Sequence, residues 1–207
     1  MKRRTLDLMA SAGGLLIAAI LLVAGLVLSA NASFANTYVA DQLGEQKITF
    51  PTVDEMSDEE RAVPCLVENA GQPLTTGKQA ECYANNFIGL HLQGIAGGKT
   101  YAELGDVQSE LRAQIAEAQR TNADNLADLQ AELQTVTQQR ETVFKGETLR
   151  GLLLTSYGFS ELGAKAGLAA TVAYIGAGLM LLLSVLGFWH AARTPATQAF
   201  AAPEPAR

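Results

Sequence analysis

Hydrophobic positions along the chain form two uncharged runs, with a long intervening stretch in which apolar residues recur at helical spacing. The first run covers residues 8–30 and the second covers residues 167–189, and neither contains Asp, Glu, Lys or Arg. Each run has about 23 residues, close to the roughly 20 that a helix needs to cross the hydrocarbon of a bilayer. The pattern therefore predicts an all-α membrane protein with two transmembrane helices.

Charge at the ends of these runs predicts their orientation. The basic run Lys2–Arg4 precedes the first span, and basic flanks stay preferentially in the cytoplasm. Residues 1–7 are therefore expected in the cytoplasm. Two crossings would return residues 190–207 to the same side, as an Ala- and Pro-rich tail that is predicted to be disordered. Residues 31–166 would then form an extracytoplasmic helical domain of a bacterial cell membrane protein.

A cleaved signal peptide is the alternative for the first run, because Ala30-Asn31-Ala32 resembles a small-x-small cleavage site. The apolar stretch from Gly13 to Leu28 is at or beyond the upper length for the apolar region of a signal peptide. It also passes into helix-favouring residues, which favours an uncleaved anchor. A mature chain that starts at Ser33 would instead have one span.

Small residues recur every four positions in both runs. The first run has Ala10, Gly14 and Ala18, and the second has Ala169, Ala173 and Ala177. Such stripes allow helices to approach closely. In an antiparallel pair these two stripes would not face each other, so each could serve a helix of a partner or of a second copy. The alternative is that alanine is simply abundant in this chain.

The longest helical pattern between the runs covers residues 101–144. Its apolar residues step by three and four in two sets, namely Leu104, Val107, Leu111, Ile115 and Ala118, and then Leu126, Leu129, Leu133 and Val136. The polar segment 121–125 shifts the phase between the sets, so the chain either continues or folds back there. We expect one long or weakly kinked coiled-coil-like arm, because no proline or glycine lies at the phase shift in residues 121–125. Residues 104–143 are the predicted surface for a second copy or an envelope protein partner.

A shorter helix is predicted over residues 77–93, because Thr76 and Gln79 have the spacing of a capping box. The apolar segment 149–159 is too short and too interrupted to span a membrane. After a break at 145–148, we expect it to pack against the shorter helix at the membrane surface. The two segments predict a candidate pocket or interface with these members: Tyr83, Phe87, His91, Leu152 and Tyr157.

The two cysteines, Cys65 and Cys82, both belong to the expected extracytoplasmic domain. An even number of cysteines outside the cytoplasm predicts a disulfide, here closing a loop of about 18 residues. A redox-active pair is the alternative, but the C-x-x-C spacing of such pairs is missing.

Charge and motifs offer little evidence for catalysis or for cofactor binding. The flanks hold five of the 15 basic and two of the 21 acidic residues, so the middle of the chain carries a net charge of about −9, which disfavours nucleic acid. The acidic segment 54–60 lacks the spacing of a calcium loop and is expected to be a solvated turn or helix start. The sequence Gly94–Thr100 fails the phosphate-loop pattern, because residue 93 is glutamine. We therefore expect no cofactor, no bound metal and no enzyme activity.

Three stretches carry a resemblance to a known family. They are residues 76–80 (Thr-Gly-Lys-Gln-Ala), 97–101 (Gly-Gly-Lys-Thr-Tyr) and 144–154 (Phe-Lys-Gly-Glu-Thr-Leu-Arg-Gly-Leu-Leu-Leu). With the two spans and the Gly187–His190 exit, they resemble a family of uncharacterised actinobacterial membrane proteins whose members often carry the label aromatic ring-opening dioxygenase. Such chemistry needs two histidines and a carboxylate on one iron. His91 and His190 are expected on opposite sides of the membrane, so the resemblance implies the architecture and leaves the activity open.

Two function hypotheses follow from this pattern. The first is a membrane-anchored interaction or scaffold protein of the bacterial cell envelope, in contact with the lipid bilayer and with a partner through the helical arm. The second is a domain that senses or handles a small ligand or a lipid, with the candidate pocket as its site.

Overall fold

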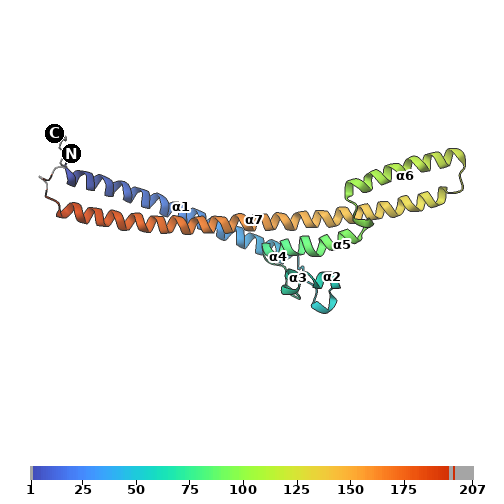
Figure 1. The fold of residues 1–207 in the computed structure, drawn as a ribbon, viewed down its shortest axis with the longest axis horizontal. Helices are drawn as coiled ribbons and strands as arrows, with labels where there is room; N and C mark the ends of the chain where they lie inside the picture. The colour runs from blue at the N-terminus through green and yellow to red at the C-terminus, as the bar shows by residue number, and fades with distance from the viewer. Residues whose placement is uncertain (1, 196–197, 199–207) are drawn as a thin grey trace, which may run out of the picture. The chain divides into compact units, whose positions relative to one another are not determined.

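The computed structural model describes residues 2–195 and 198 of the 207-residue chain. The described part is helical and contains no strand, with one isolated bridge between Thr49 and Pro73, which confirms the all-α prediction. Most of the predicted disordered tail lies outside the described residues. Figure 1 shows the elements, which are α1 (Arg3–Glu45), η1 (Val53–Glu55), α2 (Asp58–Arg61), α3 (Pro64–Glu68), α4 (Gly77–Cys82), η2 (Tyr83–Ile88), α5 (Gly89–Gly94), η3 (Ala96–Gly98), α6 (Tyr101–Thr121) and α7 (Leu126–Arg193).

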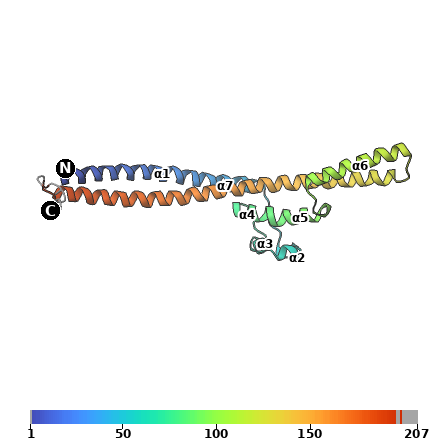
Figure 2. The ribbon, with the colours of Figure 1, turned by 45° about the horizontal axis from the view of Figure 1, so that its top comes forward.

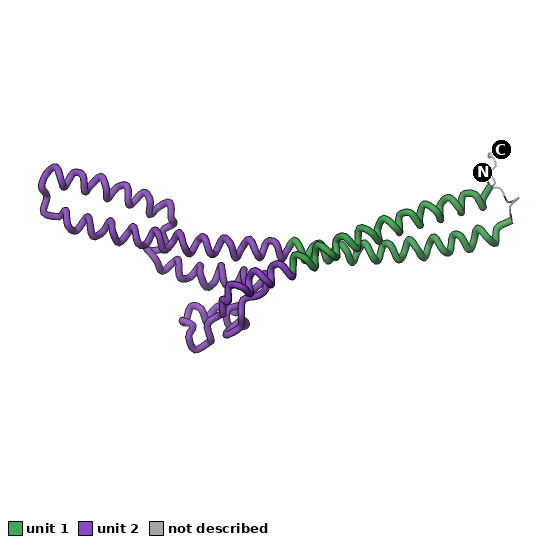
Figure 3. Tube along the Cα trace, turned by 180° about the vertical axis from the view of Figure 1, so that it is seen from behind, with its two compact units in different colours: residues 1–36, 162–207 green, residues 37–161 purple. Residues whose placement is uncertain are grey.

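The chain divides into two compact units (Figure 3). Unit 1 contains residues 1–36 and 162–207, and unit 2 contains residues 37–161. The helices α1 and α7 are each continuous in sequence from one unit into the other. The two units are described separately below.

Unit 1 is an antiparallel pair formed by the N-terminal part of α1 and the C-terminal part of α7 (Figures 1 and 2). Both helices contain an uncharged segment long enough to cross a membrane by length and composition. Only 22% of each apolar segment is buried within the protein. The two predicted long apolar helices are therefore present, and most of their large apolar side chains face outward.

Small side chains fill the contact between the two helices of unit 1. The buried ones are Ser11, Gly14, Ala18, Gly25, Ala32 and Ala35 on α1, and Gly163, Ala170, Ala173, Ala177, Ser184 and Ala191 on α7. A Cβ atom added at Gly14 would lie 2.5 Å from Ser184 Oγ, so the backbones meet closely there. In each predicted stripe, two of the three small residues are buried in this pair, namely Gly14 and Ala18 on α1 and Ala173 and Ala177 on α7.

Unit 2 has a core of large apolar side chains gathered from many short elements. Its largest fully buried side chains are Phe50, Leu66, Leu74 and Leu104. Around them pack side chains from α1, the 77–94 region and α7, including Val39, Leu43, Ala80, Ile88, Leu92, Val143 and Leu153. Short elements can be held in this way because the free energy of apolar burial comes from tertiary contacts rather than from helix propensity.

The predicted helix at 77–93 is present as α4, η2 and α5 in succession. Its start is confirmed, because Gln79 N donates to Thr76 Oγ1 at 3.2 Å and the Gln79 side chain accepts from Thr76 N at 3.0 Å. The middle six residues, Tyr83–Ile88, are wound as a π-helix, which the spacing of apolar residues does not reveal. Such turns occur frequently at functional sites.

The helical arm folds back, so the expectation of an unbroken arm at 121–125 is wrong. Helix α6 ends at Thr121, α7 begins at Leu126, and the two run side by side as the α6–α7 hairpin, residues 101–144 (Figures 1 and 2). Asn122 takes a left-handed conformation with φ of 52° and ψ of 45°, and its N–H donates to Ala118 O. Asparagine tolerates this conformation better than most residues, so it can end a helix without glycine.

The predicted break at 145–148 is also wrong, because α7 passes through these residues without interruption. Gly146 has a packing role instead. A Cβ atom there would lie 2.5 Å from Leu92 Cδ2, so the glycine lets α5 approach α7. The apolar segment 149–159 therefore belongs to one long helix, as does the second uncharged run.

Candidate functional site

The disulfide predicted from the two cysteines is present in unit 2. Cys65 in α3 is bonded to Cys82 in α4, with their Cα atoms 6.1 Å apart. Asn86 Nδ2 lies 3.3 Å from Cys65 Sγ and donates to it. The bond ties the α2–α3 region to the helix that begins at Gly77.

Three of the predicted pocket residues stack on one another instead of surrounding a space. The ring centroids of Tyr83 and Phe87 are 4.6 Å apart, and those of Phe87 and His91 are 4.5 Å apart. Phe50 extends the row, with its ring centroid 5.2 Å from that of Tyr83 in an edge-to-face arrangement. This aromatic row packs one side of the π-helix against the segment that follows α1.

Glu60 lies beside the aromatic row, and sequence reasoning missed it. Its side chain is 7% exposed, its Oε2 accepts from Ser57 N at 2.6 Å, and its Oε1 lies 3.6 Å from His91 Nε2. Burial of the Tyr83 ring raises the pKa of its hydroxyl, and the negative charge of Glu60 adds to that shift. The Ser-x-x-Glu spacing from Ser57 to Glu60 is a capping-box signal that could have singled out this carboxylate.

The acidic segment 54–60 forms the end of η1 and the start of α2, as a turn and a helix start. Glu55 closes a capping box with Thr52, as Glu60 does with Ser57. The hydrogen bond from Thr52 N lowers the pKa of Glu55. Within residues 2–195 and 198, no group of three His, Cys, Asp or Glu side chains is arranged to hold a metal ion.

Tyr157 lies apart from the aromatic row, under the side chain of Lys78. Lys78 Nζ donates to Tyr157 Oη at 3.2 Å and lies 3.2 Å from Glu161 Oε1. The hydrogen bond to Tyr157, followed by that to Glu161, raises the pKa of Lys78. Gly77 meets Ser160 at the same place, so this contact fixes the start of α4 against α7. The predicted packing of 149–159 against the 77–93 helix is present here.

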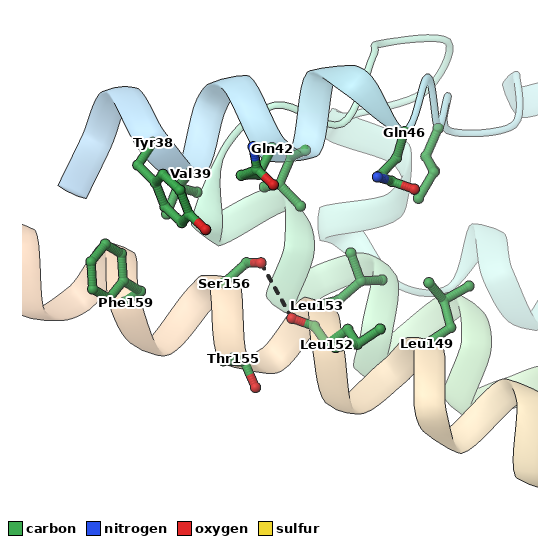
Figure 4. Close-up of a pocket in the computed structure, with 12 residues that line it drawn as sticks. Tyr38, Val39, Gln42, Gln46, Leu149, Leu152, Leu153, Thr155, Ser156 and Phe159 are labelled. Atoms are coloured by element: carbon green, nitrogen blue, oxygen red, sulfur yellow. Dashed lines mark hydrogen bonds between the residues drawn. The ribbon is translucent and has the colours of Figure 1, made fainter. Parts of the chain in front are cut away.

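Leu152 lines a different space, an apolar cavity of about 420 Å³ between α1 and α7 within unit 2 (Figure 4). One wall comes from residues 38–48 and the other from residues 149–159. The lining residues are Tyr38, Val39, Gln42, Leu43, Gln46, Ile48, Leu149, Leu152, Leu153, Thr155, Ser156 and Phe159. Figure 4 shows Ser156 beside Leu152, where Ser156 Oγ donates to Leu152 O at 3.2 Å. The sequence singled out Leu152 but not the opposite wall on α1.

An exposed aromatic pair marks the base of the α6–α7 hairpin. Tyr101 is 43% exposed and Phe144 is 55% exposed, and their ring centroids are 5.6 Å apart. The guanidinium carbon of Arg140 lies 4.0 Å from the centroid of the Tyr101 ring. Arg140 also donates to Tyr101 O at 3.2 Å and to Gln108 Oε1 at 2.8 Å. We call Tyr101, Arg140 and Phe144 the aromatic–arginine cluster, which the helical spacing did not predict.

Comparisons with protein-family models, with curated proteins and with solved structures find no match to this chain. The resemblance to an actinobacterial membrane protein family therefore stays a prediction. The two histidines belong to different units, with His190 Nδ1 3.0 Å from Asp7 Oδ2 in unit 1 and His91 beside Glu60 in unit 2.

Proposed function

We propose that this chain is a bacterial membrane protein with two spans and an extracytoplasmic unit 2, which binds a protein partner through the α6–α7 hairpin. The aromatic–arginine cluster is the observation that carries the proposal. Both termini would lie in the cytoplasm.

Two observations support membrane anchoring. In the apolar segments of α1 and α7, only 22% of the residues are buried within the chain itself. A core helix of a soluble protein would hide most of such a surface. The contact between the helices uses glycine, alanine and serine, which is how helices pack in lipid, where apolar burial gives no drive to associate.

The aromatic–arginine cluster supports the interaction role. Tyrosine and arginine are enriched among the residues that dominate binding energies at protein interfaces. Tyr101 and Phe144 are held in place by their mutual contact and by Arg140, so little side-chain entropy would be lost on binding. The rest of the hairpin surface is mainly Gln, Glu, Arg and Ala, so these two rings stand out on it.

The surroundings of the cluster indicate the charge of the partner. A hollow of about 290 Å³ adjoins it, lined by Tyr101, Gln108, Arg112, Thr137, Arg140, Glu141, Phe144 and Lys145. Three of these side chains are cationic and one is anionic, so the hollow carries a net positive charge. An acidic surface would complement it, either on another envelope protein or on a second copy of this negatively charged chain.

Photo-crosslinking in native membranes tests the partner role. A crosslinking amino acid at Lys145, in the hollow, should capture a discrete partner identified by mass spectrometry, whereas one at Gln130, farther along the hairpin, should not. Truncating the exposed rings with Tyr101→Ala and Phe144→Ala should reduce the captured product at least about tenfold. Equal capture at Lys145 and Gln130, or capture that survives both truncations, would refute the role of the cluster.

Fusion reporters test the topology separately. Alkaline phosphatase inserted after Ala123, in the turn of the hairpin, should be active, and a fluorescent protein fused to the C-terminus should fluoresce. The opposite pattern would invert the orientation. Sequencing of the mature N-terminus tests the signal-peptide alternative, because a start at Ser33 would leave one span.

A further inference from the structure

The walls of the cavity in unit 2 are the direct continuations of the two apolar helices. On α1, Tyr38 follows the end of the first uncharged run at Ala30 by eight residues within one helix. On α7, Phe159 precedes the start of the second run at Gly167 by eight residues, again within one helix. If the runs span a bilayer, both walls leave it at the same boundary.

The lining of the cavity fits an alkyl chain. Its side chains include no acid and no base, and seven of the 12 are purely aliphatic or aromatic hydrocarbon groups, to which the ring of Tyr38 adds an eighth apolar surface. Leu152 is 63% exposed and Leu149 is 40% exposed, so large apolar groups open into this space without cover from unit 2. A cavity of about 420 Å³ is within the range of sites for small ligands, roughly 300–1,000 Å³.

Two polar side chains of the lining, Gln42 and Gln46, follow Tyr38 along the sequence. Gln42 lies one turn beyond Tyr38 in α1, about 6 Å farther along the helix axis, and Gln46 is the first residue after α1 ends at Glu45. Within the part of the chain that the structure describes, neither glutamine amide has a hydrogen-bond partner. Amide N–H groups can donate hydrogen bonds to ester carbonyls. The amides of Gln42 and Gln46 are farther along the chain from the first uncharged run than Tyr38.

We propose that the cavity between residues 38–48, which form the end of α1 and the segment just after it, and residues 149–159 of α7 binds one acyl chain of a bilayer phospholipid. The proposal rests on the membrane anchoring proposed above. The acyl chain of the lipid lies between Tyr38 and Leu152, with its methyl end toward the spans. The glycerol esters of the lipid accept hydrogen bonds from Gln42 and Gln46. This is the direction that a lipid of the outer leaflet has in the bilayer, so binding requires no inversion of the lipid.

Photo-labelling of the full chain in proteoliposomes tests this site. The vesicles contain phosphatidylethanolamine with a small fraction of the same lipid carrying a diazirine in one acyl chain. Label should be found by mass spectrometry on residues 38–48 and 149–159 as well as on the spans. Ser156→Trp fills the cavity and should reduce the label on both walls about tenfold, while label on 167–189 is unchanged. Thr148→Trp, an exposed position outside the lining, is the matched control and should keep the wall label.

A second variant tests the site without adding a bulky side chain, in case Ser156→Trp disturbs folding. Gln42→Leu with Gln46→Leu leaves the apolar lining intact and removes the proposed ester contacts, so wall label should fall severalfold with the Cys65–Cys82 bond still formed. Equal wall label in Ser156→Trp and Thr148→Trp, or label confined to the spans, would overturn the acyl-chain site alone. Absence of label from residues 167–189 would instead refute membrane anchoring and the site together.

Discussion

Unit 1 and unit 2 bury opposite kinds of side chain. Unit 1 buries glycine, alanine and serine and exposes large apolar groups such as Leu16, Val172 and Leu183. Unit 2 buries Phe50 and Leu66 within a core assembled from short elements. Burial of large apolar groups stabilises a fold in water, whereas close contact of small residues suffices in lipid. The two units therefore differ in the size of the side chains that they bury, and this is the difference expected if unit 1 lies in lipid, as proposed above, and unit 2 in water.

Helix α7 contains both arrangements in one continuous element. Its residues in unit 2 bury Val136, Val143 and Leu153, and its residues in unit 1 bury Ala173 and Ala177. Backbone structure is therefore identical where the packing differs. Side-chain size on the buried face, and not helix formation, distinguishes the two units.

The largest expected effect comes from removing the disulfide of unit 2. Cys65→Ser with Cys82→Ser should lower the free energy of unfolding of unit 2 by about 3 kcal/mol, because the unfolded chain loses a closed loop. Hydrogen exchange of the full chain in detergent should accelerate between residues 50 and 94. The fluorescence of Trp189, the single tryptophan and a residue of unit 1, should not change. A change at Trp189 would show that the units unfold together.

A smaller effect is expected from overfilling the helix contact of unit 1. Gly14→Leu places a side chain against Ser184 and should destabilise the helix pair by about 2 kcal/mol. Trp189 fluorescence during unfolding in mixed micelles measures the loss. Gly13→Leu is the matched control, since a Cβ atom there meets no atom within 4 Å, and it should be neutral. If both variants behave alike, small residues do not hold the pair.

A third prediction concerns the start of α6 in unit 2. Thr100→Ala removes the acceptor for Glu103 N and should destabilise the first turn by about 1 kcal/mol. Hydrogen exchange of residues 101–105 should report the change. Thr135→Ala, at an exposed mid-helix position, is the control and should leave exchange in its own turn unchanged or slightly slower.

The smallest effect is a pH dependence at the same turn. The hydrogen bond from Thr100 N lowers the pKa of Glu103 from its ordinary value of 4.5. Its contribution to stability is therefore fully present above that value and is lost as pH falls through the lowered pKa of the folded state. Glu103→Gln should flatten the pH dependence of exchange in the first turn of α6 from about pH 6 to about pH 3. Glu132→Gln, on the exposed side of the hairpin, should not flatten it.

Local signals in the sequence predicted much of the helical framework. The capping box at Thr76 and the spacing of Leu104 and Leu111 depend on residues within one or two turns of each other. Two predictions were wrong, the unbroken arm and the break at 145–148. Each concerned a position whose residue type is compatible with two different local structures. Asn122 can continue a helix or end it in a left-handed turn, and Gly146 can break a helix or admit a neighbour.

The candidate sites could be predicted only in part. Tyr83, Phe87 and His91 share one side of a helix by spacing, but their stacking with Phe50 depends on a contact more than 30 residues away along the chain. Tyr38 and Leu152 come from opposite ends of unit 2, and no periodicity within either segment links them. The aromatic–arginine cluster likewise joins α6 to α7 only because the hairpin folds back.

The sequence by itself determined the helical class, the two uncharged runs and the pairing of Cys65 with Cys82, because periodicity, run length and an even cysteine count are properties of the chain. The tertiary structure decided where the arm turns, which small residues meet, and that a cavity opens between α1 and α7. These features depend on how distant surfaces complement each other in shape. Close packing of that kind is a property of pairs of elements, and no local pattern encodes it.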